Sequence, residues 1–543
     1  MRKNYFSRNL IAAMMLSVSS SMVSCSGLID AVIGTEDIPA SSQSSSATSP
    51  VTITDKGAAI NVSSPSDITK ALDQLKSNIV AAAAKGETLK VTVAGSGVAT
   101  GAADQKITIP QNNGADVEIA FAAAPTGTAS NALVLEASEG AGEIPGDANN
   151  ALTVTMPPSE GLALTIELPE TTVSLKTDGT GAVVYDDVIA KTAKQTIIIN
   201  EGVTIKEHEL VGGNIVVKKG GAIETIAVTI KDSPSLVCLG SWWSGVCFKE
   251  NGPEPQYEIR NEDDSPYVPK NLILRKGAGD YTSLETRCRA DEYVDRVTVD
   301  EGITIAYVGD QMNGQYKNIE GKGNNRLHTR AGLSPEGEYF AGFGSNTELV
   351  KNFTIANEIH DVEELYQDVA NLVINFVDSE TSSKIFTFEN CKFENSKTQF
   401  ALSAKKYKAV IHYMALEEGI DPAAPDAWMH VYDETDLSAL LEKGVPNKEV
   451  GGGEAGGYWI DEQLDEESLE GQDLTFTLNF KNCSIGGEAI TKDKVKFPTW
   501  GLWASGNIKF KVIIDGNTYI AVTKWYGDDD PRNGEITLEE ITE

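Results

Sequence analysis

Short strand-like segments at close intervals are the feature that most constrains the fold of this chain. From residue 89 onward, apolar residues alternate with Thr, Lys or Glu, and Gly, Asn, Asp and Pro separate the segments, as in KVTVAG, KITIPQ, VEIAFA, ALTVTM and TIIIN. Alternation with a period of two predicts β-strands that turn one face inward. Two-residue hairpin turns are few and the loops vary in length. This pattern is typical of a parallel β-helix, in which coils stack and insertions are expelled outward.

One strand–bend–strand phrase occurs twice, as TIIINEGVTIKE at 196–207 and VTVDEGITIA at 297–306. A looser copy, VVKKGGAIETI, covers 216–226. Asn and Asp tolerate a left-handed backbone and Gly adopts positive φ, so both phrases predict corners of the coil at Asn200, Gly202, Asp300 and Gly302. The alternative is that the acids beside the glycines, Glu201 and Glu301, have a chemical role.

A helix is predicted ahead of the strands, over residues 64–86. Ser64 is a suitable N-cap, Pro65 suits the first turn, Asp67 complements the helix dipole, and Gly86 ends the helix. One apolar face at helical spacing combines Ile68, Leu72, Leu75, Ile79 and Val80. We expect this single helix to cap the first coil, whose edge would otherwise be open to aggregation.

The segment from residue 90 to 309 resembles right-handed parallel β-helix proteins of the pectate-lyase-like superfamily, and it is similar in rhythm to their non-catalytic members on bacterial surfaces. The resemblance implies a right-handed solenoid with a binding or structural role. A second resemblance, to surface leucine-rich repeats with IPEGVTxIG phrases, ranks lower. Those repeats carry an Ala-Phe-x-x-x-Cys segment after the phrase, and neither copy here has it.

The fold class expected is therefore all-β, with a β-helix and its N-terminal helix over 51–312. A loop-rich break is expected at 313–345, and 346–543 is expected to be a continued β-helix or a separate β-rich domain. Two FxNC phrases, which end at Cys391 and Cys483, favour continuation because Asn suits a corner and Cys an inward position. The turn at Asp515-Gly516 predicts some antiparallel structure near the end.

The first residues predict export and anchoring. Residues 1–24 combine basic residues with a short apolar run, and Met22-Val23-Ser24-Cys25 resembles the lipobox of bacterial lipoproteins. That resemblance implies acylation of Cys25, attachment to the membrane through the lipid, and location at the outer membrane because Ser follows the Cys. An ordinary secretory signal is the alternative. The Ser-rich segment 25–50 predicts a flexible tether.

Charge and length limit the classes of function. With 543 residues the chain exceeds one compact core, which favours several domains or an elongated solenoid. Its net charge of −34 repels nucleic acid, so DNA or RNA is not an expected partner. Five scattered His residues and the Cys spacing suggest no zinc site, and we expect neither a metal nor a cofactor.

The remaining candidate residues are cysteines and tryptophans. Cys238 and Cys247 flank LGSWWSGV and are predicted to close a disulfide across a hairpin tip. Cys391 and Cys483 are interpreted as buried thiols, with a disulfide between the two as the alternative. Exposed tryptophans stack on sugar rings, so a glycan platform is one interpretation of Trp242, Trp243, Trp500 and Trp503. Packing in the core or in loops is the alternative for each of them.

No catalytic residue is assigned. An acidic stretch with one Arg could line a groove, but a solvated acidic face explains it better; its charged residues are Asp291, Asp295, Arg296, Asp300 and Asp310. A hydrolase on this scaffold requires carboxylates that converge from adjacent coils. The sequence therefore favours a lipid-anchored envelope protein that contacts glycans or other envelope components. The alternative is a carbohydrate-active enzyme, a polysaccharide lyase or glycoside hydrolase, on the same scaffold.

Overall fold

The structure is a computed structural model of the chain. It describes residues 51–54, 57–61, 65–94, 105–109, 116–123, 133–137, 151–168, 171–190, 195–209, 214–230, 235–240, 245–250, 257–262, 267–287, 294–308, 316–329, 342–343, 347–357, 372–376, 383–396, 398–404, 407–421, 423–434, 457–465, 467–499, 501–504, 507–526 and 533–541. The described part is mostly strand, and most strand pairs are parallel.

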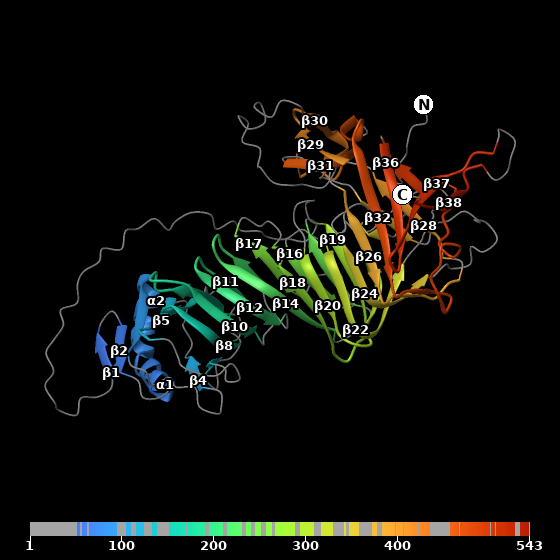
Figure 1. Cartoon of the computed structure of the whole chain (residues 1–543). Helices are drawn as coiled ribbons and strands as arrows, with labels where there is room; N and C mark the ends of the chain where they lie inside the picture. The colour runs from blue at the N-terminus through green and yellow to red at the C-terminus, as the bar shows by residue number, and fades with distance from the viewer. Residues whose placement is uncertain are drawn as a thin grey trace. The chain divides into compact units, whose positions relative to one another are not determined.

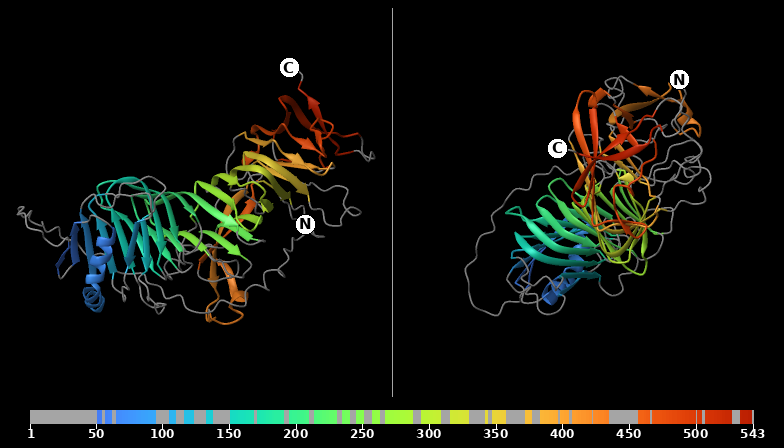
Figure 2. Two further views of the ribbon diagram at one scale, coloured as in Figure 1. Left: turned by 90° about the horizontal axis from the view of Figure 1, so that it is seen from below. Right: turned by 45° about the vertical axis from the view of Figure 1, so that its right-hand side comes forward.

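From β3 to β14, consecutive strands alternate between two parallel ladders (Figures 1 and 2). Ladder A begins with β2 (Gly57–Asn61), β3 (Thr88–Ala94), β5 (Asp116–Phe121), β7 (Ala151–Met156), β9 (Thr172–Thr177), β11 (Thr196–Ile199), β13 (Asn214–Val217) and β17 (Tyr257–Asn261). Ladder B contains β4 (Gln105–Ile109), β6 (Leu133–Ala137), β8 (Ser159–Glu167), β10 (Val183–Ala190), β12 (Val203–Glu209), β14 (Ala222–Ile230), β18 (Asn271–Lys276) and β20 (Val294–Val299).

One antiparallel insertion interrupts ladder A without ending it. Strand β16 (Gly245–Glu250) pairs antiparallel with both β17 and β15 (Ser235–Gly240). Parallel pairing then resumes through β19 (Tyr281–Arg287) and β21 (Thr304–Val308). The extra strand leaves the ladder order intact, because two antiparallel steps restore the original strand direction.

The segment expected to be a loop-rich break is in part a long strand, so that expectation is wrong for 316–329. Strand β22 (Tyr316–Thr329) pairs with β20 through its first half and with β21 through its second. Strand β24 (Leu349–Asn357) pairs in parallel with both halves of β22. The two ladders therefore run on across this segment; residues 313–315, 330–341 and 344–345 lie outside the described part.

The last third of the chain continues the ladders and adds a third sheet. Ladder B continues through β26 (Ile385–Glu389), β32 (Asp473–Lys481) and β36 (Asn507–Ile514), and ladder A through β27 (Lys392–Phe393) and β33 (Ser484–Ile485). A parallel sheet is formed by β23 (Gly342–Phe343), β25 (Leu372–Asn375), β28 (Phe400–Ala404) and β35 (Leu502–Ala504). The continuation predicted from the FxNC phrases is confirmed as parallel pairing.

Antiparallel strands end both ladders and form one separate sheet. Strand β1 (Val51–Thr54) pairs with β2 at the first end, and β34 (Glu488–Ala489) pairs with β33. The hairpin of β36 and β37 (Asn517–Thr523), followed by β38 (Ile536–Glu540), confirms the turn predicted at Asp515-Gly516. The separate three-stranded sheet contains β29 (Tyr407–Leu416), β30 (Val431–Glu434) and β31 (Gly457–Leu464). Two short 3-10 helices are η1 (Ala427–His430) and η2 (Glu467–Leu469).

The predicted N-terminal helix is present as two helices, α1 (Pro65–Gln74) and α2 (Lys76–Lys85). Four of the five residues predicted to form the apolar face are fully buried. Val80 is 52% exposed, so its assignment to that face is wrong. Val80 is rotated by about 100° around the helix from Ile79, and the buried stripe does not extend that far. Helix α1 packs against β4, where the Thr69 hydroxyl accepts a hydrogen bond from Thr108 N at 3.0 Å.

In-register pairing stacks apolar side chains in inward columns. Along ladder A, Val173, Ile197, Ile215 and Ile259 follow one another in register, and each is at most 1% exposed. Full burial of one such side chain contributes roughly 1.5–3 kcal/mol. Similar columns continue along both ladders, so the core is a rod of stacked aliphatic and, near the end of the chain, phenylalanine side chains.

The repeated NEG and DEG phrases are corners, as predicted, but they lie at opposite turns. The first leads from ladder A to ladder B, between β11 and β12, and the second leads from B to A, between β20 and β21. Gly202 has φ +76° and Gly302 has φ +77°. Asn200 is not left-handed; its side-chain amide donates to Leu175 O at 2.9 Å, which ties its corner to the preceding coil.

A stack of left-handed asparagines forms the B-to-A corner in the last third. Asn352, Asn390 and Asn482 have φ between +50° and +64°, and Asp515 continues the stack at +44°. Asn482 Nδ2 donates to Asn390 Oδ1 at 2.9 Å, and Asn390 Nδ2 donates to Asn352 Oδ1 at 3.0 Å. The following Cys391 and Cys483 are buried and form no disulfide with each other, which confirms the prediction of inward thiols.

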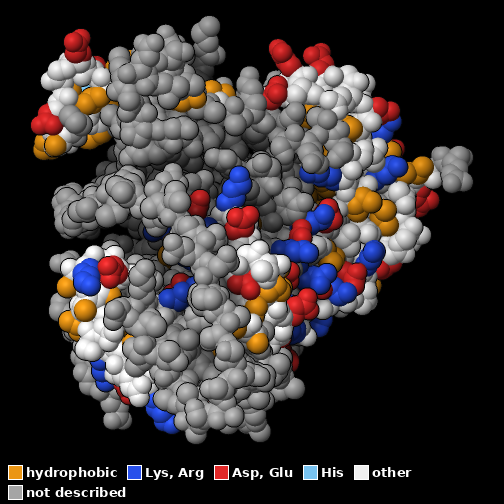
Figure 3. All heavy atoms as spheres, turned by 90° about the vertical axis from the view of Figure 1, so that its left-hand side faces the viewer, with side chains coloured by type: hydrophobic (Ala, Val, Ile, Leu, Met, Phe, Trp, Pro, Cys, Tyr) orange, Lys and Arg blue, Asp and Glu red, His pale blue; other side chains and the backbone are white. Residues whose placement is uncertain are grey.

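Outward positions carry ion pairs that join successive strands. Arg296 Nε lies 3.2 Å from Glu320 Oε1, and Lys351 Nζ lies 2.6 Å from Glu389 Oε1. Figure 3 shows acidic and basic side chains interspersed over one flank of the described surface. Opposite charges in neighbouring positions neutralise each other locally, and because these pairs are exposed to solvent they contribute little to stability. Within the described residues, no helix is long and apolar enough to span a membrane.

The corner geometry predicts that Gly202 matters for stability and that its neighbour Glu201 does not. A Cβ at Gly202 would lie 3.0 Å from Thr177 Cγ2, in addition to the strain of positive φ. We expect Gly202→Val to lower the free energy of unfolding by about 1–3 kcal/mol and Glu201→Gln to change it by less than about 0.5 kcal/mol. Urea unfolding measures both, and a tolerated valine would contradict the corner assignment.

Candidate functional site

A shallow hollow of about 420 Å³ lies at the A-to-B turn, where β9, β11, β13 and β17 end. It is lined by Lys176, Thr177, Asn200, Glu201, Lys218, Lys219 and Glu262. The last residues of the four strands pair in register as Leu175, Ile199, Val217 and Asn261. The residue that follows each of them therefore takes one place in a single row, which we call the lysine row: Lys176, Asn200, Lys218 and Glu262.

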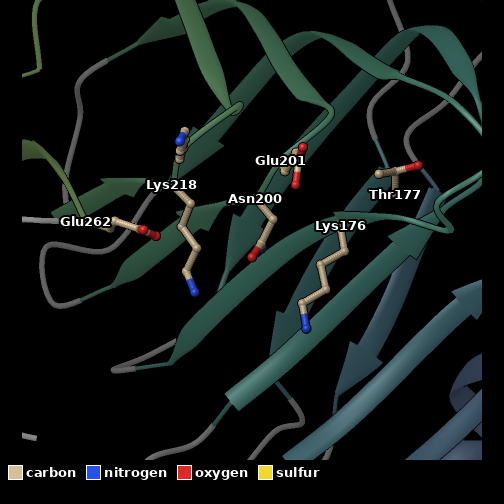
Figure 4. Close-up of a pocket in the computed structure, with 7 residues that line it drawn as sticks. Lys176, Thr177, Asn200, Glu201, Lys218 and Glu262 are labelled. Atoms are coloured by element: carbon tan, nitrogen blue, oxygen red, sulfur yellow. The ribbon is translucent and has the colours of Figure 1, made fainter. Parts of the chain in front are cut away.

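The backbone of the turn continues the ladder into the lysine row. Asn200 N donates to Leu175 O at 3.2 Å, and Lys218 N donates to Ile199 O at 2.9 Å. Paired strands lie about 4.7–4.9 Å apart, so the backbones of Lys176 and Lys218 are separated by roughly 9–10 Å. Figure 4 shows the side chains of Lys176, Asn200 and Lys218 extended to the same side, with Glu201 on the other side of the turn.

The lysine row presents donors that point away from the core. Asn200 uses its Nδ2 group to donate to Ser174 Oγ at 2.8 Å and to Leu175 O at 2.9 Å, which fixes the amide. Lys176 and Lys218 are exposed, and neither forms an ion pair with another residue of the described part. Their ammonium groups are therefore available to a ligand, on either side of an amide whose orientation is set.

The hollow is locally positive in a strongly acidic protein. Three lysines against two glutamates give its lining a charge of +1, whereas the whole chain carries −34. Positive groups amid a negative surface create a local attraction for anions, which acts over about 8–10 Å at physiological ionic strength. The arrangement suits two anionic groups of one extended ligand, one at each lysine.

A second polar cluster lies on ladder B, where Asp187 of β10 pairs in register with Glu207 of β12. Burial, and then the charges of Glu207 and Glu209, raise the pKa of Asp187 to about 6, although Arg275 opposes the shift. Asp187 Oδ1 has no hydrogen-bond partner in the described part. A carboxyl with this pKa is the kind of group that acid–base catalysis uses.

The neighbours of Asp187 do not supply the second carboxylate that glycoside hydrolysis needs. Arg275 forms ion pairs with both Glu207 and Glu209, and the distance from Arg275 Nη1 to Glu209 Oε2 is 3.0 Å. Thr229 Oγ1 also donates to Glu209 Oε1 at 2.6 Å. Both glutamates are therefore engaged by Arg275, and this cluster leaves one carboxyl outside these ion pairs rather than a catalytic pair.

His208 lies in the core beside this cluster, in register with Val188. Its Nδ1 donates to Val188 O at 2.5 Å, which places the proton of the neutral ring on Nδ1, while the buried Nε2 has no partner among the described residues. Burial lowers the pKa of His208 to about 4, because a charged imidazole would lose its hydration without a compensating acceptor. Its role is that of a neutral core residue.

Most of the site residues predicted from the sequence lie outside the described part. These are Cys25, Trp242, Trp243 and Trp500, together with the side chains of Cys238, Cys247 and Trp503. The backbone confirms the predicted hairpin: β15 and β16 are antiparallel, and Cys238 lies directly opposite Cys247. Trp503 is in β35, in register with Ser403. The disulfide and the aromatic sugar platform stay predictions.

The acidic stretch 291–310 does not converge where the structure describes it. Asp295 is near the start of β20 and Asp300 follows its end, so the backbone separates them by about 16 Å of strand. Asp300 Oδ1 accepts a hydrogen bond from Lys322 Nζ at 2.7 Å. Asp291 and Asp310 lie outside the described residues. The interpretation as a solvated, ion-paired face fits this geometry.

The lysine row could not be predicted from the sequence, because strand register, and not a constant spacing along the chain, brings its residues together. Its members are separated by 24, 18 and 44 positions in the chain, with no constant repeat to align them. The available signal was that a polar residue follows the last inward apolar residue of each strand. Within the described residues, no group of three or more His, Cys, Asp or Glu side chains is placed to hold a metal ion.

Comparison of the chain with protein-family models, with curated proteins and with solved structures finds no match.

The two shifted pKa values predict opposite effects of acid on stability. Because the pKa of His208 is lowered to about 4 from 6.5, only the unfolded chain gains its proton as pH falls through this window, and stability is lost. The loss approaches about 3 kcal/mol at pH 4. The pKa of Asp187 is raised to about 6, so its contribution is present at low pH and is lost as pH rises from 3.8 through 6.

Urea unfolding at pH 7, 5.5 and 4 tests both signs. We expect His208→Gln, which does not titrate here, to become less sensitive to acid than the native chain. Asp187→Asn should become more sensitive, because the opposing contribution is removed. Identical pH profiles for the native chain and His208→Gln would contradict the buried neutral imidazole.

Proposed function

We propose that this chain is a lipid-anchored protein of the bacterial cell envelope that binds an extended anionic glycan along a right-handed parallel β-helix. The lysine row at the A-to-B turn is the observation that carries the proposal. The role is binding rather than catalysis, and the ligand contacts several coils at once.

The alternating ladders support the solenoid. From β3 to β14, each strand of one ladder is followed by a strand of the other, and parallel pairing links each strand to one in the next coil. A chain that winds this way buries its inward columns continuously and sends longer loops outward. Parallel connections are right-handed in nearly all known cases, which supports the handedness.

The chemistry of the lysine row supports an anionic, polymeric ligand. Lysine ammonium groups bind carboxylate, sulfate or phosphate as point charges, and an amide between them offers hydrogen bonds to hydroxyl groups. A hollow this shallow does not enclose a small molecule on most sides, which argues for a ligand that lies across the surface. A glycan with acidic groups at regular intervals combines these properties.

A carbohydrate-active enzyme on the same scaffold is the second candidate, and the raised pKa of Asp187 favours it. It ranks below binding because Arg275 holds both neighbouring glutamates in ion pairs. A polysaccharide lyase or glycoside hydrolase would also need a substrate cleft over this cluster. The hollow that the structure describes lies instead at the lysine row.

The N-terminal sequence supports the location at the outer membrane. Its lipobox-like Met22-Val23-Ser24-Cys25 would supply the acyl anchor, and the Ser-rich 25–50 would let the folded part reach ligands away from the bilayer. Two or more acyl chains are needed for stable anchoring, and triacylation of one cysteine would meet that requirement.

Loss of the two lysines should weaken binding to an acidic polysaccharide. We expect Lys176→Ala/Lys218→Ala to reduce affinity for a polyuronate by about tenfold or more, measured by calorimetry at low salt. The matched control is Lys90→Ala/Lys106→Ala, which removes the same charge from outward lysines paired with Glu118 and Glu136. Equal losses in both double variants would mean that net charge, and not the row, governs binding.

The anchor has its own test. Cys25→Ser removes the thiol that would be acylated, so we expect the protein to move from the membrane fraction to the soluble fraction. A Ser24→Ala variant, which keeps the cysteine, serves as the control. Unchanged membrane association of Cys25→Ser would refute the lipoprotein assignment and leave the glycan proposal to be judged separately.

A further inference from the structure

In the separate sheet β30–β29–β31, a loop joins β29 to β30, and the structure describes its residues 417–421 and 423–430. The loop closes through a hydrogen bond from Glu417 N to His430 O at 3.1 Å. Inside it, successive turns satisfy the backbone, with bonds from Ile420 N to Glu417 O, Ala424 N to Asp421 O, Ala427 N to Ala424 O and Met429 N to Asp426 O. The loop is therefore shaped in advance of any contact with a partner.

The end of this loop and the strand that follows it, β30, present three large apolar side chains to solvent. Trp428 is 62% exposed, Met429 is 66% exposed and Tyr432 is 43% exposed. The neighbouring Ala427, the first residue of η1, is buried. We name these three exposed side chains the Trp428 surface. Exposed apolar side chains grouped together mark interaction sites more often than scattered single ones do.

The charges around the Trp428 surface have one sign. From Ala415 to Glu434 there are six carboxylates and no Lys or Arg. Five of the six side chains are exposed: Glu417, Glu418, Asp421, Asp426 and Asp433. Two of these five face histidines, since Glu417 Oε2 lies 3.1 Å from His430 Nδ1 and Asp433 Oδ2 lies 2.8 Å from His412 Nδ1. The stretch that carries the apolar groups therefore contains six acids and one histidine, His430, but no Lys or Arg.

We propose that the Trp428 surface docks a basic peptide segment in which Arg or Lys alternates with apolar residues. Charge complementarity selects this occupant, because a neutral or acidic partner would desolvate the carboxylates without pairing them. The indole face of Trp428 attracts a guanidinium, and the flexible thioether of Met429 adapts to an aliphatic neighbour. The ordered loop lowers the entropic cost of binding.

This surface is independent of the lysine row. The lysine row selects anions, and the Trp428 surface selects cations. One protein would thereby hold an acidic glycan and a basic polypeptide at different places, and failure of either proposal leaves the other intact.

The test uses the full chain and a short fluorescein-labelled peptide of alternating Arg and Leu, with anisotropy as the readout. We expect binding by the native protein and about tenfold or greater weakening in Trp428→Ala/Met429→Ala, because truncated hot-spot side chains dominate such contacts. The matched control is Trp525→Ala, which removes a tryptophan that is 70% exposed elsewhere. It should bind within about twofold of the native protein.

A second pair of variants separates specific docking from general attraction to an acidic protein. Glu418→Gln/Asp426→Asn keeps the apolar groups, and we expect weaker binding with a smaller dependence on salt. A peptide with Glu in place of Arg should not bind. The proposal is overturned if the peptide does not bind, if the tryptophan and methionine change has no effect, or if a neutral oligosaccharide binds this surface and the basic peptide does not.

Discussion

Parallel backbone hydrogen bonding from coil to coil is the interaction on which the rest of this structure depends. It fixes neighbouring strands in register, so each residue lies above one position of the coil before it. Inward columns such as Val173, Ile197 and Ile215 follow directly, because one register error would turn every apolar side chain outward. The pairing also determines where the corners occur, because the chain must turn at both edges of each ladder while its backbone hydrogen bonds to the next coil are kept.

The corners show two solutions to the same steric problem. At Gly202 and Gly302 the missing Cβ permits positive φ, whereas Asn352, Asn390 and Asn482 adopt a left-handed backbone and bond to one another through their amides. A glycine corner needs no side chain to hold its backbone, so neighbouring side chains can contact a ligand, as we propose for the lysine row beside Gly202. An asparagine stack commits the side chains to the fold, because each amide is used by the next coil.

Function is proposed where side chains are not used by that framework. Many outward charged side chains on the ladders form ion pairs with one another, as Arg296 does with Glu320 and Lys351 with Glu389. The lysine row and the Trp428 surface are places where described side chains remain available. They have opposite charge preferences, which a net charge of −34 conceals. Local arrangement, and not total charge, therefore determines what each part of the surface attracts.

The sequence by itself determined the strand content, the glycine corners, the inward cysteines and the turn at Asp515-Gly516, because each depends on periodicity or on local backbone preference. Tertiary structure alone decided that the two repeated phrases occupy opposite corners, that 316–329 is a strand shared by both ladders, and that Val80 faces solvent. It also decided the lysine row, in which consecutive members are up to 44 positions apart in the chain. Register between distant strands places these residues, and register is set by the sum of many pairings that no single segment encodes.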